Sequence, residues 1–274
     1  MFRQSTIRSP AVAGTFYPGE KGALRQMVQM LLERAPDEDL PAPCALVAPH
    51  AGYVYSGYTA ACAYKSLKSM KQKGEGSGDK SQRVFLVGPS HRVYLEGVSV
   101  GGFSSFSTPL GDIPLDQTLI EKMVGSESDI STENAPHLQE HSLEVHLPFI
   151  QEILGATLLV PMVYGKVSAK RIAHILGQYA GPDDLIIVSS DLSHFYTEEQ
   201  ANTLDAQCHT AMKSGDAETM ESLHACGNTG MAALLELAKK KGWKNDLVDY
   251  RTSAETSGDR SSVVGYASYL FRPE

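Results

Sequence analysis

Four short runs of apolar residues, partly β-branched, stand out along the chain. They cover residues 44–49, 84–89, 157–163 and 185–190, and each is bounded by Gly, Pro or Asp. A continuous apolar run of this length is typical of a strand that is buried on both faces of a sheet. The pattern therefore predicts buried strands at these four places.

Apolar positions spaced three and four residues apart predict helices between and after these runs. One such stripe is formed by Leu143, Leu147, Ile150 and Leu154. Strand and helix alternate, which predicts the α/β class with a central, largely parallel or mixed sheet flanked by helices. The expected helices cover residues 57–70, 142–154, 168–179, 197–212, 216–224 and 229–241.

Smaller elements complete the expected organisation. Residues 97–101 and 113–115 could pair as an edge hairpin around turn residues between them, and residues 263–271 look like a final strand. The turn residues are Pro109, Gly111 and Asp112. Residues 71–82 are polar and Gly-rich, which predicts a surface loop too short to separate two domains. We therefore expect residues 1–274 to form a single domain.

Composition and charge narrow the function. The chain of 274 residues has 24 Lys and Arg against 32 Asp and Glu, a net charge of -8, and no basic stripe, so nucleic acid is not an expected partner. The four cysteines form no CxxC pair, which favours a reduced, intracellular protein. No signal-peptide core and no stretch of about 18 apolar residues stands out, so we expect a cytoplasmic protein that does not enter a membrane.

Polar residues able to bind a metal or carry a proton follow three of the apolar runs. His50 follows the first run, His91 follows the second, and Asp191 and His194 follow the last. Ligands of open α/β sheets bind outside the carboxyl ends of the strands, where the loops diverge. We therefore expect these side chains to meet in one site, although a single such His is more often a capping or surface residue.

Residues 140–148 contain two carboxylates and two histidines, but not at the H-E-x-x-H spacing of zinc proteases. If a helix begins near Ser142, His141 and Glu144 can lie on one side of it while His146 points elsewhere. One histidine could then reach the site while the other serves structure. The other explanation is a helix N-terminus whose acidic residues interact with the helix dipole.

Cys226 lies in a break between two predicted helices. A thiol near a helix N-terminus ionises more readily, and the thiolate is the form that binds metal or attacks a substrate. By contrast, Cys44, Cys62 and Cys208 lie in apolar or helical surroundings, which is typical of buried packing residues. Packing as a small apolar group is also the alternative explanation for Cys226.

Taken together, the motifs resemble the Memo family, whose prokaryotic members are labelled AmmeMemoRadiSam system protein B. The matching stretches run in order from near the N-terminus to the last strand, cover essentially the whole chain, and as a series are highly specific. They are AGTFYPG (13–19), APHAGYVYSG (48–57), GPSH (88–91), TPLGDIPLD (108–116), EHSLEVHLPF (140–149), VSSDLSHF (188–195), ACGNTGMAALLE (225–236) and SVVGYA (262–267).

This resemblance implies a fold similar to class III extradiol ring-cleaving dioxygenases, which bind non-haem Fe(II) through two histidines and a carboxylate. By the same resemblance, His50 and His91 are metal ligands and Cys226 replaces the carboxylate. His194 is then the histidine that handles protons, with Asp191 beside it. A soft thiolate next to two imidazoles suits copper, zinc or iron.

The resemblance further implies a metal-dependent redox protein, a candidate oxidoreductase, with Fe(II) or copper as cofactor and open positions for O2 or a small organic molecule. Two other interpretations stay open. One is a non-catalytic binding or scaffold protein that keeps a dioxygenase-like crevice and partners the family's radical-SAM protein. The other is a zinc hydrolase in which His194 or Glu144 acts as the base.

Overall fold

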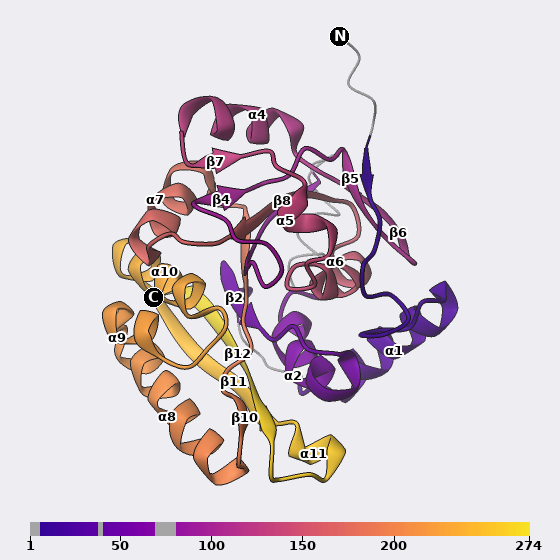
Figure 1. Ribbon diagram of the computed structural model, residues 1–274, viewed down its shortest axis with the longest axis vertical. Helices are drawn as coiled ribbons and strands as arrows, with labels where there is room; N and C mark the ends of the chain where they lie inside the picture. The colour runs from indigo at the N-terminus through magenta and orange to yellow at the C-terminus, as the bar shows by residue number, and fades with distance from the viewer. Residues whose placement is uncertain (1–5, 38–40, 69–80) are drawn as a thin grey trace.

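A computed structural model of the chain describes residues 6–37, 41–68 and 81–274. Most of the expected loop at 71–82 lies outside these residues, and its last residue, Gln82, already belongs to strand β3 (Gln82–Pro89). The structure has the expected α/β architecture: a central mixed sheet with helices packed against it (Figure 1).

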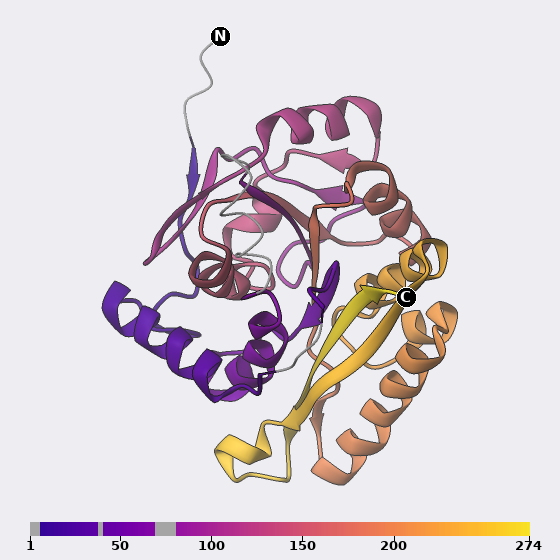
Figure 2. The same ribbon diagram turned by 180° about the vertical axis from the view of Figure 1, so that it is seen from behind.

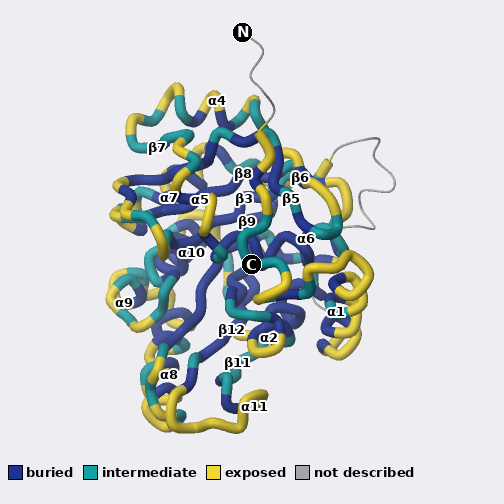
Figure 3. The backbone as a smooth tube through the Cα atoms, turned by 45° about the vertical axis from the view of Figure 1, so that its right-hand side comes forward, coloured by how far each residue is buried: buried dark blue, intermediate teal, exposed yellow. Residues whose placement is uncertain are grey.

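The four apolar runs form the centre of the sheet, as the sequence predicts. They are β2 (Ala45–Ala48), β3, β8 (Thr157–Tyr164) and β9 (Leu185–Ser189), which lie parallel in the order β2-β9-β3-β8. Nearly all of their residues are buried, because helices cover both faces (Figure 3).

Antiparallel strands extend the sheet on both sides, so that nine strands of the described chain belong to it. Next to β2 lies β12 (Val263–Pro273), the expected final strand, which also pairs with β10 (His194–Tyr196) and β11 (Trp243–Thr252). On the opposite side, β4 (Val98–Ser99) pairs with β8 and with β7 (Ile130–Ser131).

The order in which the chain visits the central strands decides which face each helix covers. From β2 to β3 and on to β8 the chain moves in one direction across the sheet, and from β8 to β9 it returns. Right-handed crossovers therefore place the helices of the two legs on opposite faces. Figures 1 and 2 show α1 (Lys21–Arg34), α2 (Tyr53–Lys65) and α6 (Leu147–Leu154) together on one side, and α7 (Ala169–Tyr179) and α10 (Asn228–Lys241) on the other.

The remaining helices lie around this core. Helix α8 (Glu198–Ser214) packs against β11 and β12. The shorter helices are α4 (Gln117–Ser126), α5 (Ala135–Leu138), α9 (Ala217–Ser222) and α11 (Ala254–Ser257).

Two helix starts differ from the sequence-based expectation. The helix expected at 57–70 begins at Tyr53, three residues after His50. The helix expected from Ser142 begins instead as a 3-10 turn, η1 (Glu144–His146), and continues as α6. The α-helix starts only at Leu147, because Pro148 lacks an N–H and is tolerated in the first turn of a helix.

The expected hairpin has the right turn but the wrong partner strand. The turn joins β5 (Ser105–Thr108) to β6 (Gly111–Pro114), and these strands form a separate small sheet with β1 (Ile7–Arg8). Of residues 97–101, Val98 and Ser99 form β4 in the main sheet instead. There Gly97 approaches β7 so closely that a Cβ would lie 2.2 Å from the Asp129 carbonyl oxygen.

A buried carboxylate fastens the N-terminal segment to the body of the protein. Glu144 is fully buried and forms a salt bridge with Arg8, whose side chain is also buried. The remaining hydrogen bonds to Glu144 are donated by Ala11 N at 2.7 Å, Val12 N at 2.9 Å and Tyr17 Oη at 2.6 Å.

The other donors of Arg8 reach the segment that precedes Glu144. Arg8 Nε donates to the His137 carbonyl oxygen at 3.0 Å, and Nη2 donates to the Glu140 carbonyl oxygen at 2.6 Å. One guanidinium thus connects the N-terminal segment to three points between residues 137 and 144.

We expect Arg8→Ala to lower the free energy of unfolding by about 3–5 kcal/mol, because it leaves the Glu144 charge buried without a counterion. The matched control is Arg25→Ala, which removes the ion pair with Glu152 in which Arg25 is 45% exposed. That change should cost less than about 1 kcal/mol. Urea denaturation followed by circular dichroism measures both, and equal losses would contradict the structural role of Arg8.

Candidate metal centre

Three of the expected site residues meet at one edge of the sheet. His50, His91 and Asp191 follow β2, β3 and β9, which are neighbours and parallel, so their carboxyl ends lie together. The ring centroids of His50 and His91 are 5.1 Å apart, so the two imidazoles lie close together. The Asp191 side chain accepts a hydrogen bond from His50 N at 2.7 Å and so joins the ends of β2 and β9.

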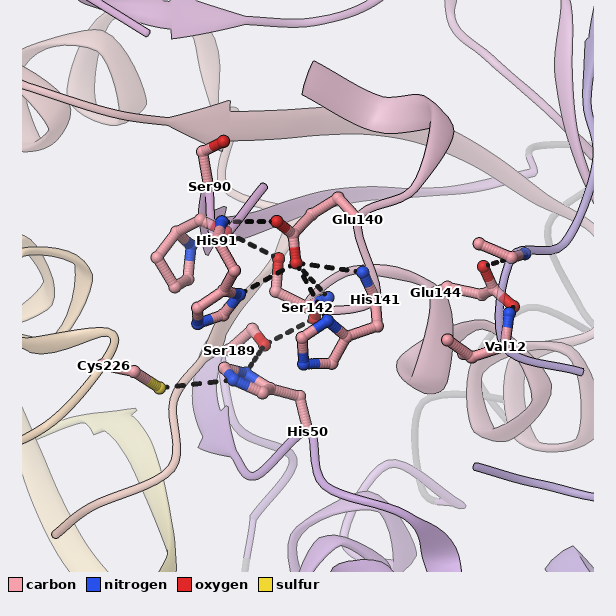
Figure 4. A network of polar contacts seen from close by, with 12 residues as sticks. Val12, His50, Ser90, His91, Glu140, His141, Ser142, Glu144, Ser189 and Cys226 are labelled. Carbon is pink, nitrogen blue, oxygen red and sulfur yellow. Dashed lines mark hydrogen bonds and ion pairs between the residues drawn. The ribbon is translucent and has the colours of Figure 1, made fainter. Parts of the chain in front are cut away.

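His141 supplies a third imidazole to this cluster. Its ring centroid lies 5.4 Å from that of His50 and 4.9 Å from that of His91. Each of the three residues offers one ligand atom, and these atoms all lie within 4.8 Å of one another (Figure 4). Of the two histidines between 140 and 148, His141 is therefore the one that reaches the site.

The buried carboxylate of Glu140 holds two of these histidines. Its oxygens accept from His91 Nδ1 at 2.9 Å, His91 N at 2.5 Å, and the backbone N–H groups of His141 and Ser142 at 2.9 Å each. Burial opposes ionisation of Glu140, but the hydrogen bonds and charge of His91 outweigh it and lower the pKa to about 2. Sequence analysis did not single out Glu140.

The imidazoles are suited to hold a metal ion. Burial, reinforced by His91 and His141, lowers the pKa of His50 well below its usual range, and burial lowers the pKa of His141. These two rings are therefore neutral near pH 7, which is the state in which imidazole binds metals. His91 Nδ1 is hydrogen-bonded to Glu140, and His50 Nδ1 is hydrogen-bonded to Ser189 Oγ at 2.6 Å. Metal-bound histidines typically make such a hydrogen bond with the ring nitrogen that does not bind the metal.

Cys226 lies beside the cluster, at the start of α10. Its Sγ is 3.2 Å from His50 Nε2 and 3.1 Å from Asp191 N, which donates to it. The loop presses against the end of β9, where Gly227 N donates to Ser190 Oγ at 3.0 Å. A Cβ at Gly227 would lie 2.4 Å from the Ser189 carbonyl oxygen, so only glycine permits this approach.

The expectation that Cys226 ionises easily is wrong for the protein without a bound cation. Burial, together with the Asp191 charge, raises the pKa of its thiol far above the usual range. The following helix begins at Asn228, and its dipole does not outweigh the loss of solvent around the thiol. A thiolate at this position therefore needs a positive charge beside it.

Asp191 lies next to His50, and His194 interacts electrostatically with both residues. Burial raises the pKa of the Asp191 carboxyl, and the nearby charge of His194 opposes that rise. His194 also lowers the pKa of His50, so it lies within electrostatic reach of the cluster. Asp191 does not cap the following helix, because Thr197 caps α8 through a reciprocal pair with Gln200.

Glu144 and His146 serve other contacts. Figure 4 shows Glu144 directed toward Val12 and away from His50 and His91. His146 is buried and lies against Tyr64 and Ser189. Glu144 and His141 thus do not face the same way, because the backbone at 144–146 takes a 3-10 turn.

Sequence comparisons with known proteins match nearly the whole chain. The family model described as Memo-like protein matches residues 8–270. A MEMO1 family protein of Aquifex aeolicus is 35% identical, covering 97% of this chain and 99% of that one, and another of Sulfurisphaera tokodaii is 33% identical with the same coverage. The crystal structure of an uncharacterized Escherichia coli K12 protein matches with a TM-score of 0.48 and 11% identity, covering 82% of this chain and 98% of that one.

Within the described part of the chain, no helix has the combination of length and apolar character needed to span a membrane.

We expect Glu140→Gln to lower the free energy of unfolding at pH 7 by about 3 kcal/mol. This is the stabilisation that corresponds to a carboxyl pKa that falls from about 4.3 in the unfolded chain to about 2 in the folded protein. A carboxyl whose pKa is lower in the folded protein than in the unfolded chain stabilises the fold at pH values above its unfolded pKa. This stabilisation is lost as the pH falls toward the folded pKa. The gap between wild type and variant should therefore shrink from about pH 4.3 toward pH 2. Urea denaturation at a series of pH values measures it, and a gap that stays constant would contradict this electrostatic role.

Proposed function

The chain belongs to the Memo family, and on that premise we propose that it binds one redox-active transition-metal ion, iron or copper, at the edge of its sheet. The proposal depends mainly on one observation, the convergence of three imidazole ligand atoms within 4.8 Å of one another. The proposed ligands are the imidazoles of His50, His91 and His141 and the thiolate of Cys226.

The electrostatics of the cluster favour a metal cation over protons. A proton on one ring places a positive charge against two neighbouring rings, and His91 and His141 accordingly lower the pKa of His50. The three rings, by contrast, could all direct a lone pair at one metal ion. The anionic Glu140 behind His91 makes that ring a stronger ligand.

The distance between Cys226 and His50 supports a shared metal. Tetrahedral ligands at about 2.1 Å for nitrogen and about 2.3 Å for sulfur lie roughly 3.5 Å from each other. The observed separation of Cys226 Sγ and His50 Nε2 is 3.2 Å. Imidazole and thiolate together suit copper, iron and zinc, and the family resemblance favours the two redox metals among them.

His194 is the proposed proton carrier beside this site. Imidazole can both accept and donate a proton, and Asp191 interacts electrostatically with His194. The metal would supply one-electron exchange with O2 or a small organic molecule. Glu144 is an unsuitable base for a hydrolase because Arg8 and three further donors occupy its carboxylate.

Protein purified anaerobically should contain about one iron or copper ion per chain. His50→Ala, His91→Ala and His141→Ala should each lower metal affinity by more than the about 10–100-fold typical of losing an outer contact, because each removes a ligand. His194→Ala should keep the affinity within about 10-fold of wild type. Elemental analysis and metal titration measure these quantities.

The outcomes separate the alternatives. Zinc as the resident metal would remove the redox part of the proposal and favour a hydrolase. A wild-type protein that binds none of the three metals would overturn the proposal entirely. Loss of metal in His194→Ala as complete as in His50→Ala would make His194 a ligand. Oxygen uptake in the presence of a reductant distinguishes an enzyme from a scaffold.

Metal binding near pH 7 should release the proton of the Cys226 thiol, while His50 and His141 are already neutral. That proton alone should make apparent copper affinity rise about 10-fold per pH unit. Cys226→Ser should release one proton fewer than wild type and bind copper more weakly. The control Cys44→Ser, at a cysteine whose Sγ donates to a backbone carbonyl, should behave as wild type.

Calorimetry in buffers of different ionisation enthalpy counts the protons. Equal proton release by wild type and Cys226→Ser would exclude Cys226 as a ligand. Thiol labelling supplies a second measurement: bound metal should protect Cys226, and chelation should remove that protection.

A further inference from the structure

A chain of buried hydrogen bonds runs from the metal cluster into the core. It starts at Ser189 Oγ, which lies 2.6 Å from His50 Nδ1, 2.9 Å from His146 Nε2 and 2.5 Å from the carbonyl oxygen of Ser142. Tyr64 Oη continues the chain at 2.9 Å from His146 Nδ1. Every member is almost fully buried, so solvent cannot replace a missing partner.

One backbone carbonyl sets the direction of the whole chain. The Ser142 carbonyl oxygen has no proton, so the hydroxyl of Ser189 must donate its only proton there. Ser189 Oγ can then only accept from its other two partners. The contacts to His50 and His146 are therefore Nδ1–H and Nε2–H donors, respectively.

The two tautomers follow from this direction. His146 has a pKa that burial lowers to about 3, so it is neutral and carries a single proton, on Nε2. Its Nδ1 accepts the hydroxyl proton of Tyr64. His50 carries its proton on Nδ1, and its Nε2 lone pair faces Cys226 Sγ, 3.2 Å away.

We propose that Ser189, oriented by the Ser142 carbonyl and by His146, is a positioning residue that fixes His50 in the Nδ1–H tautomer. This inference rests on the proposed function, since its purpose is to keep the His50 Nε2 lone pair available to the metal. The Nε2–H tautomer would direct a proton at the metal position and leave no lone pair there. Ser189 contacts His50 at Nδ1, the ring nitrogen that faces away from the metal position, and does not itself bind the metal.

Three substitutions separate this role from simple packing. Ser189→Ala removes the acceptor of His50 Nδ1–H. Ser189→Thr keeps the hydroxyl and serves as the rescue. Ser142→Ala is the matched control: it removes a buried hydroxyl next to the site, which donates to the Pro89 carbonyl oxygen at 2.9 Å, but keeps the carbonyl that orients Ser189.

The first measurement needs no metal. Nitrogen-15 spectra of histidine-labelled, metal-free protein report which ring nitrogen of His50 carries the proton, with His50→Gln used to assign its signals. We expect the proton on Nδ1 in wild type, in Ser189→Thr and in Ser142→Ala. In Ser189→Ala it should move largely to Nε2, because the buried Nδ1–H loses its acceptor.

The second measurement is copper affinity, with urea denaturation as the check on folding. Ser189→Ala should bind copper about 10–100-fold more weakly than wild type, the usual effect of losing an outer contact. Ser189→Thr and Ser142→Ala should stay close to wild type.

The outcomes are distinct. A wild-type His50 that carries its proton on Nε2, or a Ser189→Ala protein with an unchanged tautomer, would overturn the inference. So would an equal loss of affinity in Ser189→Ala and Ser142→Ala. If wild-type protein binds no metal, the proposed function fails, and the nitrogen-15 result still decides the tautomer.

Discussion

The arrangement of the candidate metal centre depends on the hydrogen bonds that the buried carboxylate of Glu140 accepts. A charge at this depth is tolerated only if several donors surround it. Those donors come from two segments about fifty residues apart in sequence, the loop after β3 that carries His91 and the stretch that carries His141. The same hydrogen bonds that stabilise the buried charge therefore also hold the imidazoles of His91 and His141 close together.

A second buried carboxylate extends this arrangement to the N-terminal segment. Glu144 holds Arg8, and Arg8 in turn donates to the carbonyl oxygen of Glu140. Phe16, in the same segment, packs edge-on against the His141 ring with centroids 5.0 Å apart. The N-terminal segment thus contacts the residues that carry His141. Contacts between segments distant in sequence therefore fix the geometry of the centre.

The sequence predicts the central strands and the polar residues at their ends, because a doubly buried strand needs a continuous apolar run and its carboxyl end opens toward the site. The spacing groups His141 with Glu144 and separates His146 from them, but it does not single out Glu140, and a 3-10 turn at 144–146 replaces the helix start on which the grouping with Glu144 depends. Strand β11 has no apolar run to identify it, because most of it is not buried. Pro109, Gly111 and Asp112 identify the turn between β5 and β6 but not which strand pairs with β6.

The pKa values of two carboxyl groups in the centre shift in opposite directions, because the two groups accept different numbers of hydrogen bonds. Glu140 receives four hydrogen bonds and has a pKa of about 2, whereas burial raises the pKa of Asp191, whose carboxylate receives one backbone N–H, from His50. Burial also raises the pKa of the Cys226 thiol beside Asp191. Glu140 thus keeps its charge by its own contacts, whereas burial opposes the ionisation of Asp191 and Cys226. A cation among the imidazoles would act against that effect of burial at both groups.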